Sequence, residues 1–536
     1  MKHVLTYFLL ICLILSGCAN QTESTPEPTG PELPVTAVTE ALSPTQPITE
    51  ETVPEETTEA TTEPTEALTE PPVDRVFRNP YDGYQLVVRS DYDIDTSMAQ
   101  VVTVFSKQDI VIELYRQPLT AVTPSVYVSY TNQFLNNTID HIQDLNELRY
   151  YSSREYRVIA WHREKLLRLD DDKNYYISFD TVCDTQHYSI FVKSERKTNP
   201  DDYRWLLDTL EFFPPEESAP IWESTVVEHT WNEETTRFFQ AYFSEDAPLT
   251  WGIYEPIAAN GTMDRLLSYE AYLEYRFPIL LTYRNLTHPA IDILEQVLPN
   301  NWSEDKIVVL TLQTVATADG GNMMYDILQG EYDDVLNRYA QVVRDFSHPV
   351  MVRLMNEMNG DWCVYSAYHT SKDTLIYKSV YRYIWHIFQD AGVDNAIWIW
   401  NPNEGSFPNF TWYHMLNYYP GDEYVDVVGL TAYNTGDYYW YVGETWKDFP
   451  TLYEDLYAQY CAHFSQPLMI TEFSCAAAGG DKIAWTEQML ETLETYDRIK
   501  VAIWWDGMDR DPSNGAIARD YRIDPVLDTF KEYFAS

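Results

Sequence analysis

Hydrophobic and polar positions change their pattern three times along the chain. An apolar run near the N-terminus gives way to a Thr/Pro/Glu tract without aromatic residues. Short alternating runs follow, and from about residue 250 the apolar runs become continuous and are separated by helical patterns. These changes predict a signal peptide (1–17), a disordered tether (18–75), a small α+β domain (76–215) and a larger α/β domain (216–536).

Eight short runs rich in β-branched and aromatic residues lie in the last domain, with helical segments between most of them. The runs cover residues 251–256, 278–283, 307–313, 350–355, 396–401, 425–431, 467–471 and 500–505. Short buried strands that alternate with helices indicate a parallel sheet, and eight such units indicate a (β/α)8 (TIM) barrel. A doubly wound open sheet is the alternative, but no Gly-x-Gly-x-x-Gly motif follows the first run.

The preceding domain, 76–215, shows strand-like alternation in most of its segments. We expect strands at 84–89, 101–105, 110–115, 156–161, 165–170, 175–181 and 187–193, and helices at 125–145 and 201–210. The segment contains no acid/base pair, metal cluster or Gly-rich loop. A packing role and a role in binding carbohydrate or cell wall both stay open.

The first residues have the features of an export signal. Lys2 and His3 precede an apolar run that ends in Leu15-Ser16-Gly17-Cys18. This run is shorter than the roughly 20 residues that span a bilayer. Its ending resembles a bacterial lipobox, which implies cleavage before Cys18, a lipid on its sulfur and a place at the extracellular face of the bacterial cell membrane. An ordinary signal peptide with an incidental cysteine is the alternative.

Composition narrows the classes of partner. The chain has 83 acidic against 36 basic residues, a net charge of −47, which argues against binding nucleic acid. It also has 42 Tyr and 16 Trp, which suit neutral ligands with flat apolar faces, such as carbohydrate. We predict no cofactor and no metal. Four cysteines (Cys183, Cys363, Cys461 and Cys475) match no metal motif, and Cys363 and Cys475 could form a disulfide or stay free thiols.

Two glutamates stand where a barrel carries its chemistry. Glu357 follows the fourth run and Glu472 follows the seventh. Residues at the carboxyl ends of strands line the barrel mouth, and strands four and seven lie nearly opposite each other. Two facing carboxylates are what glycosidic cleavage needs, one as acid and one as nucleophile or base. Arg353, inside the fourth run, is expected to pair with an acidic residue near the mouth.

Five longer stretches resemble glycoside hydrolase family 26, a family of mostly β-mannanases in a clan of retaining barrel glycosidases. They are residues 326–333, 357–362 (Glu-Met-Asn-Gly-Asp-Trp), 398–403, 425–433 and 470–473. The resemblance implies that Glu357 is the acid/base and Glu472 the nucleophile. It also implies that Trp362 is a sugar platform, that Tyr433 donates a hydrogen bond to the nucleophile, and that a Trp ending the eighth run lies under the sugar.

The eighth run ends in two tryptophans, Trp504 and Trp505. Alternation places one of them inside the barrel, and we favour Trp504. Further aromatic residues after the strands suggest extended subsites for a polymer: Tyr365, Tyr368, Trp400, Trp412, the run 438–441 and Trp446.

One residue departs from the family pattern. Family 26 usually has His before the acid, whereas this chain has Asn356, which in other families of the clan contacts the sugar 2-hydroxyl. The resemblance leads us to expect a retaining endo-β-mannanase acting on a polysaccharide. The departure at Asn356 keeps a β-1,4-xylanase or mixed-linkage β-glucanase open as alternatives. A non-catalytic glycan-binding lipoprotein is a further alternative, against which the two retained carboxylates argue.

The segment 509–515 resembles a calcium loop but lacks its bidentate Glu.

Overall fold

The computed structural model describes residues 73–536 except 121 and 170, and residues 74–536 belong to one compact unit. The expected signal peptide, the lipid site at Cys18 and nearly all of the tether lie outside the described residues. Among the described residues, we find no helix that is long and apolar enough to cross a membrane.

A closed barrel of eight parallel strands confirms the fold expected for the C-terminal part. Each strand pairs with its neighbours in sequence order, and the first strand pairs with the last. The strands fall on the eight predicted runs: β11 Thr250–Tyr254, β12 Ile279–Asn285, β13 Ile307–Gln313, β14 Val350–Leu354, β15 Ala396–Trp400, β16 Val427–Thr431, β17 Leu468–Phe473 and β18 Ile499–Trp505.

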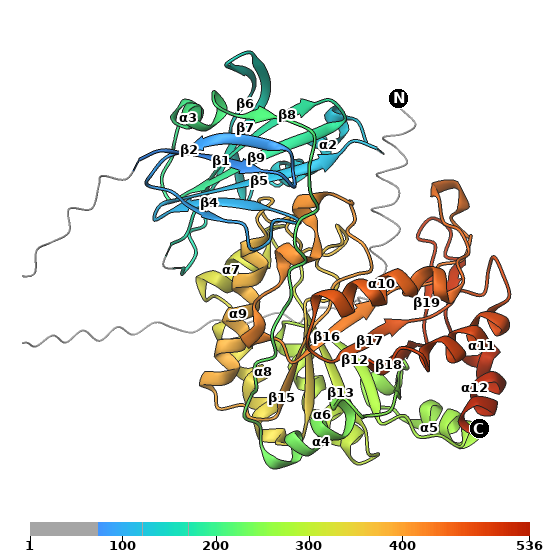
Figure 1. Cartoon of the computed structure of the whole chain (residues 1–536). Helices are drawn as coiled ribbons and strands as arrows, with labels where there is room; N and C mark the ends of the chain where they lie inside the picture. The colour runs from blue at the N-terminus through green and yellow to red at the C-terminus, as the bar shows by residue number, and fades with distance from the viewer. Residues whose placement is uncertain (1–72, 121, 170) are drawn as a thin grey trace, which may run out of the picture. The chain divides into compact units, whose positions relative to one another are not determined.

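Helices surround this barrel, and Figure 1 shows α6, α8, α9, α10 and α11 outside its strands. Between β15 and β16 the chain forms three short 3-10 helices in place of an α-helix: η5 Thr411–Tyr413, η6 Met415–Tyr418 and η7 Asp422–Tyr424. The α-helices are α4 Glu233–Phe243, α5 Asp264–Leu273, α6 His288–Trp302, α7 Met323–Gln329, α8 Asp333–Phe346, α9 Thr374–Asp390, α10 Phe449–His463, α11 Lys482–Leu493 and α12 Leu527–Phe534. Three further 3-10 helices are η4 Ala258–Asn260, η8 Trp440–Val442 and η9 Asp524–Val526.

Strand alternation divides the apolar side chains of the barrel between two cores. In β15, Ile397 and Ile399 belong to the cluster inside the barrel, while Trp398 and Trp400 belong to the cluster between strands and helices. A parallel strand of a barrel is buried on both faces, which is why the sequence of such a strand is apolar throughout. Apolarity therefore locates the strand without showing which side chains point inward.

Residues 75–212 form two antiparallel sheets. A three-stranded sheet has the order β1-β2-β10 and a seven-stranded sheet has the order β3-β4-β5-β9-β8-β7-β6, with an apolar core that includes residues of both sheets. The elements are β1 Arg75–Asn79, β2 Tyr84–Val88, β3 Asp93–Asp95, β4 Thr103–Lys107, β5 Ile110–Pro118, α2 Pro124–Thr131, η2 Gln133–Asn136, β6 His141–Tyr151, β7 Arg154–Arg163, β8 Tyr175–Cys183, β9 Gln186–Ser194, η3 Pro200–Tyr203, α3 Arg204–Leu207 and β10 Glu211–Phe212.

Two expectations for this region are wrong. The helix expected at 125–145 ends at Thr131, and the segment beyond η2 starts the edge strand β6, which pairs only with β7. Exposure alternates along the second half of β6, but the apolar residues do not follow it, since Leu148 and Tyr150 are exposed. Pairing with β7 therefore decides the conformation of this segment. The expected strand at 165–170 does not form, because the described residues 165–169 run as a loop between β7 and β8.

Buried polar contacts join the seven-stranded sheet to the barrel. Lys193 on β9 forms ion pairs with Asp373, 2.9 Å away at the N-cap of α9, and with Glu113 of β5 at 2.5 Å. Lys372 donates to the Ser189 hydroxyl at 2.9 Å. Since residues 74–536 are one compact unit, the boundary placed between residues 215 and 216 stays a prediction.

Candidate active site

Glu357 lies three residues beyond the end of β14, in an unusual backbone conformation. Its φ is +55°, and Met355 has a φ of +49°. Left-handed backbone is costly for residues other than glycine and is concentrated at functional sites. The turn is held in place by the Glu357 amide, which donates to the carbonyl of Asn401 at 2.7 Å.

The Glu357 side chain lies in surroundings that favour its neutral form. Burial and the nearby charge of Glu472 raise the pKa of Glu357 to about 8, although Arg353 opposes this shift. The indole Nε1 of Trp362 donates to Oε2 of Glu357 at 3.4 Å, which like Arg353 opposes the shift, and the Trp362 ring packs against Phe407. Glu357 can therefore hold a proton at neutral pH, as a general acid must.

Glu472 lies within β17 rather than just beyond it, and a bulge turns it toward the mouth. Leu430 pairs with Ile470, but Thr431 pairs with Glu472, so Thr471 is the extra residue. Thr471 and Glu472 are consecutive, yet Thr471 contacts the Thr431 hydroxyl of β16 and Glu472 contacts Arg353 of β14. A bulge allows this, since regular alternation would send one of the two outward.

Three donors hold the carboxylate of Glu472, which is 4% exposed. Arg353 Nη1 lies 3.0 Å from Oε1, and Asn356 Nδ2 lies 3.2 Å from the same oxygen. Tyr283 donates its hydroxyl to Oε2. Gln313 donates to Oδ1 of Asn356 at 2.9 Å, which leaves the amide nitrogen of Asn356 for Glu472. The carboxylate is thus oriented and its charge is balanced.

Arg353 was expected to pair with an acidic residue because it lies inside a buried strand, and it pairs with Glu472. It is fully buried, and besides Glu472 it donates to Thr311 at 2.8 Å and to Asn401 at 3.0 Å. Its guanidinium also lies 5.3 Å from the ring centre of Tyr283. These contacts fix the guanidinium beside the Glu472 carboxylate.

Tyr283, which the sequence interpretation missed, takes the place expected for Tyr433. Tyr283 belongs to β12 and ends the second predicted run, so its position at a strand end was the available signal. Among the described residues, Tyr433 makes no hydrogen bond to Glu472, and its ring packs near Trp505 and Tyr521. Burial raises the pKa of Tyr433 most strongly, and the charge of Glu472 raises it further. The two side chains are therefore close.

The tryptophans of the eighth strand have the opposite arrangement to the one expected. Trp504 is fully buried outside the barrel, where it packs on Phe473 and Phe530. Trp505 is the inward residue: it is partly exposed and stacks on Tyr254 with ring centres 5.2 Å apart. Trp505 is therefore the candidate sugar platform, and Trp504 is a core residue.

Trp400 is also a core residue rather than a subsite residue. It is fully buried and packs on Tyr419 and Phe464 outside the barrel. Tyr365, Tyr368 and Trp412 are likewise buried, whereas Trp440 and Tyr441 are 73% and 43% exposed. Tyr365 supports the backbone of the site, since its hydroxyl donates to the Asn356 carbonyl at 2.6 Å.

The remaining polar candidates give no sign of a metal site. Cys363 and Cys475 are both buried, and within the described part of the chain they form no disulfide with each other. Within residues 73–536 apart from 121 and 170, no group of three His, Cys, Asp or Glu side chains could hold a metal ion. Asp511 instead binds Ser513 and Asn514 of its own loop.

A parallel eight-stranded barrel with interacting glutamates after its fourth and on its seventh strand defines the class of barrel glycosidases. Residues 299–473 match the model of glycosyl hydrolase family 26, which supports this family for the barrel and a glycosyl hydrolase as the kind of enzyme.

Two curated relatives match parts of this chain. Endoglucanase H of Acetivibrio thermocellus is 29% identical over 237 residues, which are 42% of this chain and 26% of that protein. A mannan endo-1,4-beta-mannosidase of Bacillus subtilis is 37% identical over 90 residues, 16% of this chain and 23% of that protein. The chain thus spans about a quarter of the length of these relatives. A solved family 26 β-mannanase from Bacteroides ovatus has 18% identity and a TM-score of 0.44, and covers 56% of this chain and 93% of its own.

Proposed function

We propose that the protein is a retaining glycoside hydrolase that cleaves a β-linked polysaccharide, with β-1,4-mannan as the first candidate. The observation that carries the proposal is the contrast between the two glutamates. The pKa of Glu357 is raised to about 8, whereas Glu472 is bound by Arg353, Asn356 and Tyr283. Two carboxyl groups in such different surroundings can divide the roles of acid and nucleophile between them.

In the proposed reaction Glu357 protonates the glycosidic oxygen while Glu472 attacks the anomeric carbon. The covalent glycosyl-enzyme is then hydrolysed by a water whose proton passes to Glu357. Trp362 and Trp505 offer indole faces on which pyranose rings stack. Asn356 presents its amide nitrogen beside the nucleophile, where a sugar hydroxyl would lie.

A β-glucan is the second candidate substrate. The longer of the two curated matches is to a protein named as an endoglucanase, whereas the mannosidase match covers 90 residues. Asn356 replaces the usual family 26 histidine before the acid and lies beside Glu472. A residue at this position can affect which sugar the site accepts. A β-1,4-xylan has no comparable support among these relatives.

The proposal is tested by reducing-sugar release from purified mannan, mixed-linkage β-glucan and xylan. We expect cleavage of one of the first two, with retained anomeric configuration by NMR of the early products. Glu357→Ala and Glu472→Ala should each remove most of the activity, because each group takes part in bond breaking. Binding of a glycan without cleavage by the wild-type protein would contradict the proposal and favour a capture protein.

We also propose, from the sequence alone, that Cys18 carries a lipid that anchors the protein at the extracellular face of the bacterial membrane. The support is the Leu15-Ser16-Gly17-Cys18 ending of the apolar run. Expressed in its host, the full chain should partition into the detergent phase, and Cys18→Ser should move it to the aqueous phase. Equal partitioning of the two forms would refute the anchor.

A further inference from the structure

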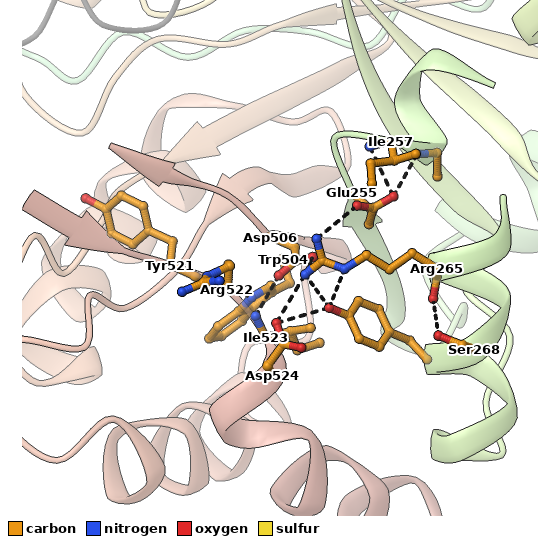
Figure 2. Close-up of polar contacts among 12 residues, drawn as sticks. Glu255, Ile257, Arg265, Ser268, Trp504, Asp506, Tyr521, Arg522, Ile523 and Asp524 are labelled. Carbon is orange, nitrogen blue, oxygen red and sulfur yellow. Dashed lines mark hydrogen bonds and ion pairs between the residues drawn. The ribbon is translucent and has the colours of Figure 1, made fainter. Parts of the chain in front are cut away.

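Arg265 of helix α5 connects three carboxylates at one side of the barrel mouth (Figure 2). Its guanidinium nitrogens lie 3.4 Å from Glu255, 3.5 Å from Asp506 and 3.1 Å from Asp524. Its Nε also donates to the hydroxyl of Tyr269 at 2.8 Å. Of the three acids, Glu255 and Asp506 have fully buried side chains, whereas Asp524 is about half exposed.

The two buried acids mark the line where the barrel closes. Glu255 directly follows β11 and Asp506 directly follows β18, and their preceding residues Tyr254 and Trp505 are register partners. The Asp506 amide donates to the Tyr254 carbonyl at 2.8 Å. Arg265 therefore bridges the ends of the first and last strands.

Without a cation, this arrangement would be unfavourable. Two carboxylates that are removed from water and close together repel each other, and each loses its hydration. Backbone amides bind one oxygen of each: Ile257 and Ala258 donate to Glu255, and Ile523 donates to Asp506. Burial nevertheless raises the pKa of Asp506 to about 6. Arg265 supplies the positive charge that lets both acids remain together.

A layer of aromatic rings leads from this bridge to the candidate nucleophile. Tyr254 and Trp505, the neighbours of the two acids, stack on each other with an interplanar angle of 17°. Tyr283 packs edge-on against Tyr254, with ring centres 5.2 Å apart, and donates its hydroxyl to Glu472. Any widening between the ends of β11 and β18 would shift these rings.

We propose that Arg265 is a positioning residue for the glycosidase reaction: it holds the ends of β11 and β18 together and thereby keeps Trp505 and Tyr283 in the geometry that the sugar and Glu472 require. This inference rests on the proposed function. Arg265 acts through the ring layer and does not itself take part in bond breaking. Because displacements of about 1 Å can cost about 100-fold in rate, such a bridge can control turnover.

The first test compares Arg265→Met with a matched control, Arg276→Met. Arg276 also approaches three carboxylates (Glu270, Glu304 and Asp305), but it precedes β12 and so lies at the opposite end of the barrel. We expect Arg265→Met to lower kcat about 10- to 100-fold with a smaller change in KM. Arg265→Lys, which keeps the charge, should regain part of kcat, and Arg276→Met should keep the wild-type kcat. Equal kcat values for Arg265→Met and Arg276→Met would overturn the inference.

The second test asks whether Arg265 acts through Tyr283. If it does, the loss of transition-state stabilisation in the double variant, calculated from kcat/KM, should be smaller than the sum of the losses in Arg265→Met and Tyr283→Phe alone. Full additivity of the two effects would overturn the inference. If Arg265→Met does not fold, Arg265→Met combined with Glu255→Gln and Asp506→Asn removes both buried charges that the single variant leaves uncompensated, and the kcat of this triple variant is measured instead. An inactive wild-type protein would refute the proposed function, whereas an active wild type with a fully active Arg265 variant refutes this inference alone.

Discussion

Tyr283 and Glu472 are 189 residues apart in the sequence, yet the phenol of one donates a hydrogen bond to the carboxylate of the other. They come from β12 and β17, the second and seventh strands of the barrel. Arg353 binds the other carboxylate oxygen and also lies near the Tyr283 ring. The candidate nucleophile is thus held from two directions by residues that no local motif connects.

Tyr283→Phe should lower kcat/KM while leaving the fold intact. Hydrogen bonds to charged groups contribute about 1.5–3 kcal/mol, so we expect a loss of about 10- to 100-fold. Tyr433→Phe is the matched control, since Tyr433 is close to Glu472 without a hydrogen bond to it in the described part of the chain. Steady-state kinetics on the cleaved glycan check this, and a larger loss for Tyr433→Phe would restore Tyr433 to the role first expected for it.

The activity should depend on pH through Glu357. Its pKa is raised to about 8 by burial and by Glu472, so the proton needed for the leaving oxygen is present below that pH and lost above it. The plot of kcat/KM against pH should therefore fall on its alkaline side near pH 8. A substrate whose leaving group needs no protonation should lose this alkaline fall. An alkaline limb below pH 6 with ordinary substrates would contradict the assignment.

Much of the barrel and its two glutamates could be predicted from the sequence because both depend on local features. Each of the eight strands is an apolar run, and Glu357 and Glu472 stand where such runs end. Each strand of a parallel barrel is buried on both faces and must therefore be apolar on both. This apolarity is visible in the sequence regardless of the loops that connect the strands.

Which face a strand-end side chain occupies could not be predicted in this way. Trp504 and Trp505 are neighbours with the same chemistry, and a shift of one residue exchanges inside for outside. Likewise, Glu472 points into the mouth only because of the bulge at Thr471, which is set by pairing with β16. The strand β6 was missed for a related reason, since its partner β7 rather than its own pattern determines it.

Replacing each of the two tryptophans with alanine should separate catalysis from stability. Trp504 is fully buried among Phe473, Trp485 and Phe530, so Trp504→Ala should cost about 3–5 kcal/mol of unfolding free energy. Trp505 is partly exposed at the mouth, so Trp505→Ala should mainly lower kcat/KM. Denaturant unfolding and kinetics measure the two effects. The orientation would be refuted if Trp504→Ala were stable and inactive.

The buried ion pair between the seven-stranded sheet and the barrel should stabilise the whole unit. Lys193 is almost completely buried between Asp373 and Glu113, so Lys193→Met leaves both carboxylates without their cation. We expect a loss of about 3–5 kcal/mol, since removing one partner of a buried pair costs that much. Lys197→Met is the control, because Lys197 is exposed and pairs with Asp144 at the surface, where such pairs contribute about 0–1 kcal/mol. Thermal unfolding followed by circular dichroism should show one transition that shifts down for Lys193→Met only; equal shifts for the two variants would show that the buried pair contributes no more than the surface pair.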